Sequence, residues 1–556
     1  MSRRNFVTSS VAALAAATLL AGCSGGSPVG SGGGVARVAS EAGGPFTRNF
    51  NPLVVLSHVA TGYSNEVVYE PLQLPDFDTG KNDPWLASSM TFSNGGKTLT
   101  IDLRPDVKWS DGVPFTSDDV AFTFNLLKQY KALNAYGFPI VSATAASTYV
   151  TAVDFSQPAY TYPFSFLYII PKHIWENVAD PVTYTDANPV GTGPFKLKSF
   201  TPQVITYVPN PYFWGTPKPK VSQLEYLAFD SADSMVTAME AGGLDWASAT
   251  VPDPQAIARH DPKDIHYFVG PPSNSVVLLW PNVTVYPLGL AVVRKAISVA
   301  LDRSTIARLG MHGFNEPVTS PTGLRMPALK DYVAPQYQSL TYPAGDPAAA
   351  RSMLLAAGFT VGSGGILVTP QGHPFDLALT VPTSSGFGDF LGAAQVIANQ
   401  LGHAGIHVTV NTEAELAWRN DQALGQFQLT LRANGGTVNP FDFYNFALNY
   451  TLAGPVGQKA SRDYGRYQNQ AVQSGFEAWA AAAPGSPELR AAEAGIEEVM
   501  VNDVPVIPVA FSASMAFWRT NNVTGFPTDS DRYTRQPFGN SDSGARLVLA
   551  HLRPAN

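Results

Sequence analysis

The sequence predicts an α/β fold with mixed sheets, and three observations support this prediction. The 556 residues are 45% hydrophobic and only 14% charged, which is a globular composition long enough for two or three domains. A strand, a turn and a helix are indicated within Asn94–Leu127. Between Phe375 and Val410 the pattern runs strand, helix, strand, and such a βαβ unit implies parallel strand pairing.

The stretch Asn94–Leu127 contains both secondary-structure periods. Asn94-Gly95-Gly96 is a turn signal because Asn and Gly tolerate positive φ. Residues 99–103 then alternate between apolar and polar side chains, as in a half-buried strand. Thr116 and Asp119 have the spacing of a capping box at the start of a helix. By itself this unit indicates stable local structure and no chemistry.

Caps, stops and apolar periodicity predict further elements along the chain. Helices are expected at Asp346–Ala357, Asp389–Gly402 and Glu488–Asn502, and strands at Phe375–Val381, Ile406–Val410 and Phe427–Leu431.

Composition excludes several classes of function. The formal net charge is −8 and no basic run is present, so we expect no nucleic-acid partner. The chain has one cysteine, Cys23, which allows neither an intrachain disulfide nor a cysteine-based metal cluster.

The first residues have the pattern of an export signal. Residues 1–22 contain two arginines and then the apolar run Val11–Leu20, which predicts a signal peptide. Leu20–Cys23 resembles a bacterial lipobox, which implies that Cys23 is lipidated and that 23–35 is a flexible tether. Ser2–Val7 resembles a twin-arginine signal, with an ordinary positive region for general export as the alternative. No later segment has 18 uninterrupted apolar residues, so no transmembrane span is expected.

Three motifs that resemble metal-binding or nucleotide-binding sites are better interpreted as ordinary turns and element ends. Asp76–Asp83 lacks two ligands of a calcium loop and is interpreted as a connection between a strand and a turn. Gly191-Thr192-Gly193 is followed by Pro194 and a strand pattern, which excludes a nucleotide-binding loop. His403 and His407 flank a predicted helix end and lack the glutamate of a zinc protease motif. We therefore expect no catalytic residues, no metal and no cofactor.

The order of the longer motifs resembles family 5 of the solute-binding proteins of ABC importers, a group that holds oligopeptide, dipeptide, nickel and some oligosaccharide binders. The family run "DGKTYTFKLR, a turn, WSDGTPFTADDV" is similar to residues 94–120. Further matches follow in order over about 50–520: Asn51–Leu53 with "NPL", Tyr69–Leu72 with "YEPL", Val190–Phe195 with "GTGPY", Asn210–Gly215 with "NPDYWGG", Ser231–Trp246 with the helix ending in "GEID", Val292–Arg303 with "VRQA…AIDR" and Val504–Val509 with "PVIPL".

The resemblance implies a two-lobed fold like that of periplasmic binding proteins, of type II and of the large cluster C form with an extra subdomain. It implies these boundaries: 36–60, 190–272 and 508–556 for the core of lobe I, 61–189 for its extra subdomain, and 273–507 for lobe II. The hinge crossings are expected near Gly270–Ser275 and near Pro505–Ala510.

The segment Thr430–Tyr444 gives the most information about the chemical class of the ligand. This segment resembles the loop in which peptide-binding members carry "W-x-x-D-x-x-D-P", and alignment on Pro440 places the Trp on Ala433 and the two acids on Gly436 and Asn439. The first acid pairs with the ligand ammonium in peptide binders, and it is absent here.

Two alternatives remain open for this segment. Asp442 replaces the missing acid, or the ligand is neutral and Asn434, Asn439 and aromatic side chains bind its hydroxyls or amides. Arg432 is a candidate for a ligand carboxylate or is a solvated surface residue.

Aromatic residues are the other ligand candidates. Most of the 31 Phe, 22 Tyr and 9 Trp are expected in the core, because each aromatic side chain buries a large area, and the remainder would suit peptide side chains or sugar faces in a cleft between the lobes. Trp280, Trp418, Trp479 and Tyr444 are expected either to line the cleft or to pack in the core.

Together these features predict a monomeric, lipid-anchored protein on the extracytoplasmic face of the membrane. It would capture an oligopeptide-like solute between its lobes and deliver it to an ABC permease. An oligosaccharide is the alternative ligand, and a secreted hydrolase is the alternative of a different class.

Overall fold

The computed structural model describes residues 34–39, 44–54, 57, 61, 64–76, 81–162, 164–249, 251–270, 275–383, 387–434, 439–513, 515–528, 530–531, 533–534 and 544–555. The expected signal peptide, the lipidated Cys23, nearly all of the tether and Gly436 lie outside these residues. Val35, expected to end the tether, instead begins the first strand.

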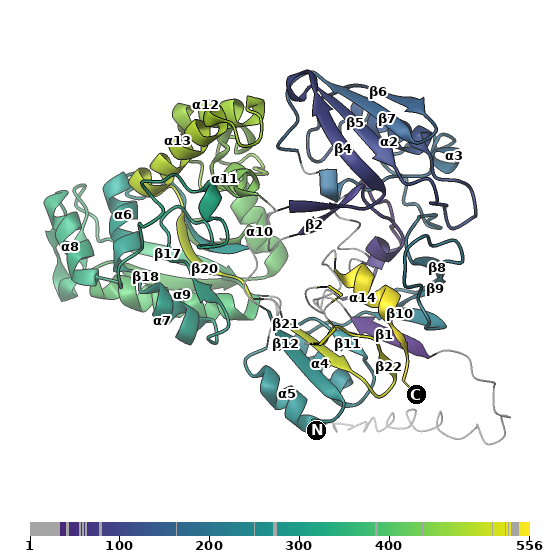
Figure 1. Ribbon diagram of the computed structural model, residues 1–556. Coiled ribbons are helices and arrows are strands. Elements are labelled where there is room, and N and C mark those ends of the chain that lie inside the picture. Colours follow the sequence, from purple (N-terminus) through teal and green to yellow (C-terminus); the bar gives the residue numbers. More distant parts are fainter. Residues whose placement is uncertain are drawn as a thin grey trace, which may run out of the picture.

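Lobe I is built on a seven-stranded sheet, in which β1 (Val35–Ala39) pairs in parallel with β10 (Gln223–Leu227) and β11 (Trp246–Ala247). Helices α4 (Ala232–Glu240), α5 (Pro254–His260) and α14 (Ala545–His551) accompany the sheet (Figure 1). The strand order is β12 (Ile265–Val269), β21 (Met515–Arg519), β11 (Trp246–Ala247), β1 (Val35–Ala39), β10 (Gln223–Leu227), β9 (Val204–Pro209) and β8 (Phe195–Phe200).

The extra subdomain of lobe I is an antiparallel four-stranded sheet with α2 (Ser117–Gln129) packed against it. Its order is β4 (Ala87–Ser93), β5 (Thr98–Leu103), β7 (Val150–Phe155) and β6 (Ile140–Ser147). The neighbouring short elements are η1 (Ser64–Val67), the hairpin β2 (Gln73–Asp76) and β3 (Lys81–Pro84), and α3 (Lys172–Trp175).

Lobe II lies on the left in Figure 1 and contains a mixed six-stranded sheet. Its order is β14 (Glu316–Pro317), β20 (Ile507–Phe511), β13 (Val276–Pro281), β19 (Leu429–Ala433), β17 (Asp376–Pro382) and β18 (His407–Glu413). The helices are α6 (Ala291–Ala300), α7 (Arg303–Thr305), α8 (Pro347–Ala356), α9 (Gly388–His403), α10 (Glu415–Leu424), α11 (Pro440–Leu448), α12 (Gln470–Ala481) and α13 (Pro487–Asp503).

Smaller elements complete the described chain: the strand pairs β15 (Thr360–Val361) with β16 (Leu367–Val368) and β22 (Val523–Thr524) with β23 (Arg553–Pro554), and the short helical turns Asn94–Gly96, Phe164–Phe166, Ile306–Gly310, Lys330–Tyr332, Ser363–Gly365 and Tyr450–Leu452.

The chain passes between the large sheets in two places. The first connection joins β12 to β13, and its residues 271–274 lie outside the described part. The second was expected at Pro505–Ala510, but Ile507–Phe511 forms β20 and pairs with β13 and β14. The connection to β21 therefore runs through 512–514. The segment whose resemblance to the family suggested a crossing first completes a strand of lobe II, and all five residues of β20 are buried.

The predicted local elements are confirmed where the sequence signals were strong. β5 shows the expected alternation of half-buried and buried residues, and the Asp119 carboxylate accepts a hydrogen bond from the Thr116 backbone N–H at 2.9 Å. β17 and β18 pair in parallel on either side of α9, as a βαβ unit requires. His403 ends α9 and His407 begins β18, so the two imidazoles do not share a helix face.

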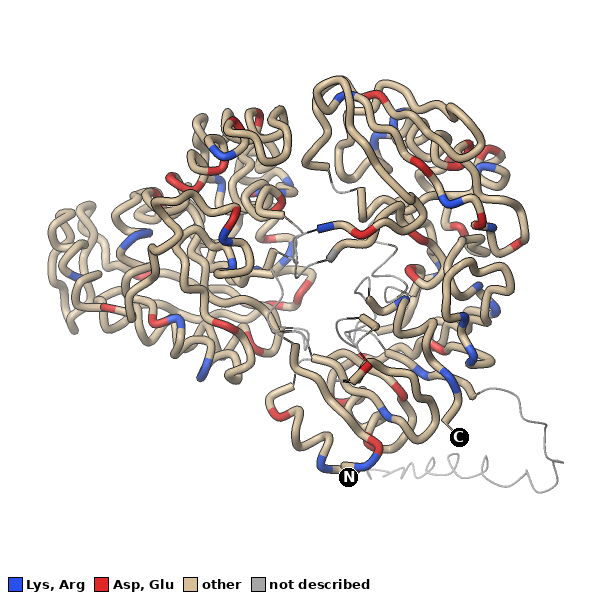
Figure 2. Tube along the Cα trace, in the orientation of Figure 1, with Lys and Arg blue, Asp and Glu red and all other residues tan. Residues whose placement is uncertain are grey.

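Charge is distributed without a dominant patch. Lys and Arg alternate with Asp and Glu over both lobes (Figure 2). None of the helices in the described ranges combines the length and the apolar character that crossing a bilayer requires.

A buried pair of acids lies on one face of α13. Glu493 and Glu497 are 5% and 0% exposed, and the Oε1 atom of each has no hydrogen-bond partner. The other oxygen of Glu497 accepts a hydrogen bond from the Ala334 backbone N–H at 2.8 Å. Burial raises the pKa of both carboxyls to about 7, and Glu493 adds to the shift of Glu497. The pair therefore holds protons that the unfolded chain releases near pH 4.

We expect the double variant Glu493→Gln, Glu497→Gln to be more stable than the natural chain at pH 8. Because the folded-state pKa values are raised, the contribution of this pair to the free energy of unfolding is fully present below about pH 4. It is lost as the pH rises through about 7. Neutral glutamines remove this loss, for a gain of about 2 kcal/mol at pH 8 and little at pH 5. Urea unfolding at the two pH values measures the difference. Glu498→Gln, on the exposed face of the same helix, is the control and should change neither value.

Candidate functional site

The first turn of α11 (Pro440–Leu448) carries Asp442, the acid of the predicted ligand segment Thr430–Tyr444. Asn439 is the N-cap, and its side-chain oxygen accepts a hydrogen bond from the Asp442 backbone N–H at 3.2 Å. Proline at the next position favours the helix start. Asp442 is thereby fixed on the first turn. Burial raises the pKa of its carboxyl to about 7, and the nearby Arg462 guanidinium only partly opposes this.

Tyr136 brings lobe I to this helix end. It lies in the loop between α2 and β6, and 39% of the residue is exposed. Desolvation raises the pKa of Tyr136 to about 12, the Asp442 carboxylate adds to the shift, and Arg462 opposes it. Asp442 and Arg462 belong to lobe II, so the two lobes face each other at these side chains.

Glu66 continues the wall of lobe I beside Tyr136. It lies in η1, and its carboxylate adds to the raised pKa values of both Tyr136 and Tyr168. Tyr168 is 8% exposed and belongs to the same hydrophobic core as Val67 and Val68. The lobe I wall therefore combines tyrosine hydroxyls with one carboxylate, opposite an aspartate and an arginine of lobe II.

Asn434 lies at the end of β19, beside the first connection between the lobes. Its side-chain oxygen accepts a hydrogen bond from the Val276 backbone N–H at 2.6 Å. The residue is 9% exposed, and its Nδ2 atom is buried without a partner. The side-chain oxygen thus holds Asn434 in place, while the side-chain nitrogen remains a donor without an acceptor.

Arg432 is not a solvated surface residue. Its guanidinium donates to the Gln422 side-chain oxygen at 2.5 Å and lies over the Tyr464 ring, 4.1 Å from the centroid. Burial lowers its pKa, although an arginine stays charged at physiological pH. Its Nε atom is buried and has no hydrogen-bond partner.

The four aromatic candidates pack inside lobe II. Trp280, Trp418, Trp479 and Tyr444 are at most 5% exposed and belong to its two hydrophobic cores. Trp418 donates to the Thr430 hydroxyl at 2.9 Å, and the Tyr444 hydroxyl donates to the Thr322 carbonyl oxygen at 3.1 Å. In this conformation packing accounts for all four, and a ligand role for them stays a prediction.

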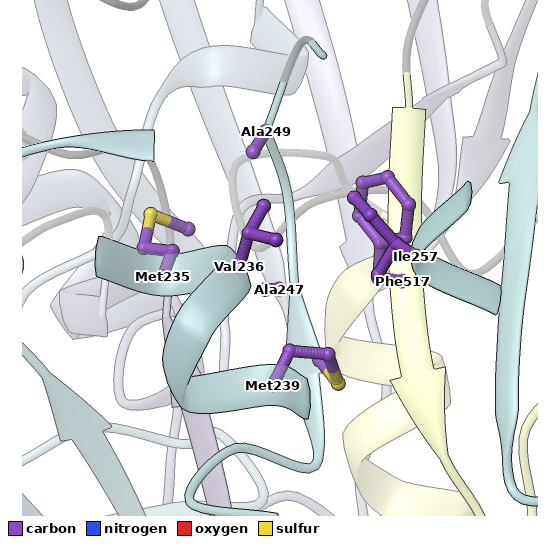
Figure 3. Close-up of a pocket in the computed structure, with 7 residues that line it drawn as sticks. All are labelled: Met235, Val236, Met239, Ala247, Ala249, Ile257 and Phe517. Atoms are coloured by element: carbon purple, nitrogen blue, oxygen red, sulfur yellow. The ribbon is translucent and has the colours of Figure 1, made fainter. Parts of the chain in front are cut away.

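A small apolar depression in lobe I is not part of this region. It lies between α4, α5 and β21 (Figure 3) and is lined by Met235, Val236, Met239, Ala247, Ala249, Ile257 and Phe517. Five of these seven residues are buried members of one hydrophobic core, so we interpret it as a packing feature. Among the described residues, no group of three or more His, Cys, Asp or Glu side chains is arranged to hold a metal ion.

Sequence reasoning missed the residues of lobe I. Tyr136, Glu66 and Tyr168 lie in irregular segments or short turns, without a motif that marks them. Their relation to Asp442 is visible only in three dimensions, because the segments come from different lobes.

Comparison with known proteins places these features in a family context. Residues 81–455 match the family of bacterial extracellular solute-binding proteins, family 5 Middle. A nickel-binding periplasmic protein of Escherichia coli K12 is 25% identical over 399 residues, covering 69% of this chain and 72% of the relative. A probable peptide-binding protein of Agrobacterium fabrum is 24% identical over 545 residues, covering 88% and 86%.

Solved structures share the fold. A periplasmic oligopeptide-binding protein of an ABC transporter from Thermotoga maritima superposes with a TM-score of 0.82 at 23% identity, covering 94% of this chain and 99% of the other. The same protein bound to mannohexaose gives a TM-score of 0.79 and covers 94% and 98%. This likeness confirms the predicted two-lobed architecture.

Proposed function

Because this chain belongs to family 5 of the bacterial extracellular solute-binding proteins, we propose that it is the substrate-binding subunit of an ABC importer. Its lobes close on a small solute, and the closed form delivers the solute to the permease. The supporting observation is the approach of Tyr136 in lobe I to Asp442 in lobe II, which marks where the two lobes meet.

An oligopeptide or another amide-rich solute is the ligand we favour. Relatives named as peptide-binding proteins support this choice. Free donors on Asn434 and Arg432 suit the carbonyl oxygens of a peptide backbone. Gly436 stays in the proposed site by its position in the loop.

An oligosaccharide is the second candidate. Asn439, which stands in place of an acid, uses its side-chain oxygen as the cap of α11 and adds no charge to the site. A neutral ligand avoids the cost of burying a cation there. The structure that binds mannohexaose on this fold supports the alternative.

The chain itself performs no chemistry in this proposal, and it acts as a monomer. Cys23 carries the lipid anchor, and the signal peptide routes the protein to the extracytoplasmic face, by the twin-arginine or the general pathway. A secreted hydrolase remains the alternative of another class.

Thermal-shift screening of the chain without its signal peptide tests the ligand class. A ligand that binds only the folded state raises its stability by RT ln(1 + [L]/Kd), which is about 2.7 kcal/mol at a ligand concentration of 100 Kd. We expect shifts with mixed tri- to pentapeptides and none with mixed oligosaccharides. Thermal shifts with oligosaccharides alone would show that the ligand is a sugar and not a peptide. Chemical conversion of any ligand that gives a shift would show that the protein is an enzyme.

A further inference from the structure

Arg546 is a buried cation that forms no ion pair with any other described residue. It lies in the first turn of α14 and is 4% exposed. Its Nε and Nη1 atoms are buried and have no hydrogen-bond partner. No carboxylate of the described chain forms an ion pair with it. Buried guanidinium nitrogens without acceptors are unfavourable, so their presence at this position calls for an explanation.

The other buried arginines of the described residues show what a structural role looks like. Arg294 donates to four backbone carbonyls, and Arg303 donates to carbonyls and to the Ser298 hydroxyl. Arg466 donates to three carbonyls, and Arg519 donates to two carbonyls and the Asp261 carboxylate. In contrast, Arg546 leaves two of its three nitrogens without an acceptor.

The surroundings of Arg546 place it at the wall that faces lobe II. Its guanidinium hydrogen-bonds the Tyr168 hydroxyl, and Glu66 and Tyr136 also act on that hydroxyl. Tyr136 in turn faces Asp442 across the lobes. Residues of α14 share a hydrophobic core with Val67, the last residue of η1, and with Val68; Figure 1 shows α14 near the seven-stranded sheet.

We propose that Arg546 and Tyr168 form an oxyanion subsite on the lobe I wall, which takes a carboxylate of the bound solute. A guanidinium offers several donors in a fixed plane, which suits the two oxygens of a carboxylate. The Tyr168 hydroxyl, which the guanidinium already contacts, orients the group. The subsite deepens the proposed function and rests on it, since it adds a carboxylate to the ligand class.

The experiment compares ligands that differ in one charge. Calorimetry measures binding of an equimolar tripeptide mixture with free C-terminal carboxylates, of the same mixture as C-terminal amides, and of a neutral oligosaccharide mixture. The proteins are the natural chain, Arg546→Met and Arg546→Lys. Arg259→Met, which removes an exposed arginine of lobe I paired with Asp253, is the matched control. Circular dichroism checks that each variant is folded.

We expect the natural chain and the Arg259 variant to bind carboxylates roughly 10- to 100-fold more tightly than amides, as for a lost charge-assisted hydrogen bond. Arg546→Met should remove that preference, and Arg546→Lys should keep part of it. Equal binding of carboxylates and amides by the natural chain overturns the subsite and leaves the peptide function intact. If Arg546→Met still binds carboxylates more tightly than amides, the subsite is also overturned and the peptide function is left intact. Binding of sugars alone, or of no mixture, overturns the peptide function and the subsite with it.

Discussion

Replacing Gly191 with alanine should destabilise lobe I by about 3 kcal/mol or more. A Cβ atom at this position would overlap the backbone carbonyl of Val68, which cannot rotate away as a side chain would. That same carbonyl oxygen accepts a hydrogen bond from the Gly193 backbone N–H at 2.9 Å. The turn that resembles "GTGPY" is therefore a packing device, since its glycines let the backbone approach the residues that follow η1. Urea unfolding followed by tryptophan fluorescence measures the loss.

Gly495→Ala is the matched control for this substitution. Gly495 lies in the middle of α13, and an added Cβ atom meets nothing within 4 Å. Alanine favours a helix over glycine by about 1 kcal/mol, so the control should gain stability where Gly191→Ala loses it. If Gly191→Ala were as stable as the natural chain, the turn would not fix η1. The position of Glu66 on the lobe I wall would then need another explanation.

Local structure was predictable because its causes are local. The alternation of residues 99–103 and the capping pair Thr116 and Asp119 act over a few residues, and the structure confirms both. The second connection between the lobes was misplaced by a few residues. An apolar run with two prolines is compatible with a strand at the edge of a lobe or with a connection between lobes. Only the pairing of β20 with β13 shows that this run is a strand.

Only the lobe II part of the candidate site was predictable from the sequence. The resemblance pointed to Thr430–Tyr444 and named Asn434, Asn439 and Asp442, because a contiguous loop can be aligned. It could not separate a cleft tryptophan from a core tryptophan, since both need a large apolar environment, and Trp280 and Trp418 are packed in the core. Tyr136 and Arg546 were missed because their roles depend on contacts between distant segments.

We propose that Asp442 decides which of the two open ligand classes the protein accepts. Its carboxyl has a raised pKa of about 7 because burial disfavours the charge, so below neutral pH it is largely protonated in the empty protein. An ammonium group of a ligand would stabilise the carboxylate and draw its proton off. Binding of an amine would therefore release a proton, whereas binding of a neutral ligand would not.

We expect the affinity for tripeptides with a free amino group to rise by about tenfold between pH 5.5 and 7, because the ionised fraction of a carboxyl with a pKa of about 7 grows by that order while the amine stays charged. Asp442→Asn should bind these peptides roughly 10- to 100-fold more weakly at pH 7 and without the pH dependence. N-acetylated peptides should show neither effect. Asp376→Asn, an exposed carboxylate of lobe II paired with His407, serves as the control and should bind as the natural chain does. Equal, pH-independent binding of free and acetylated peptides by the natural chain would show instead that this cleft binds a neutral ligand end, with the free amide donor of Asn434 as the contact that remains.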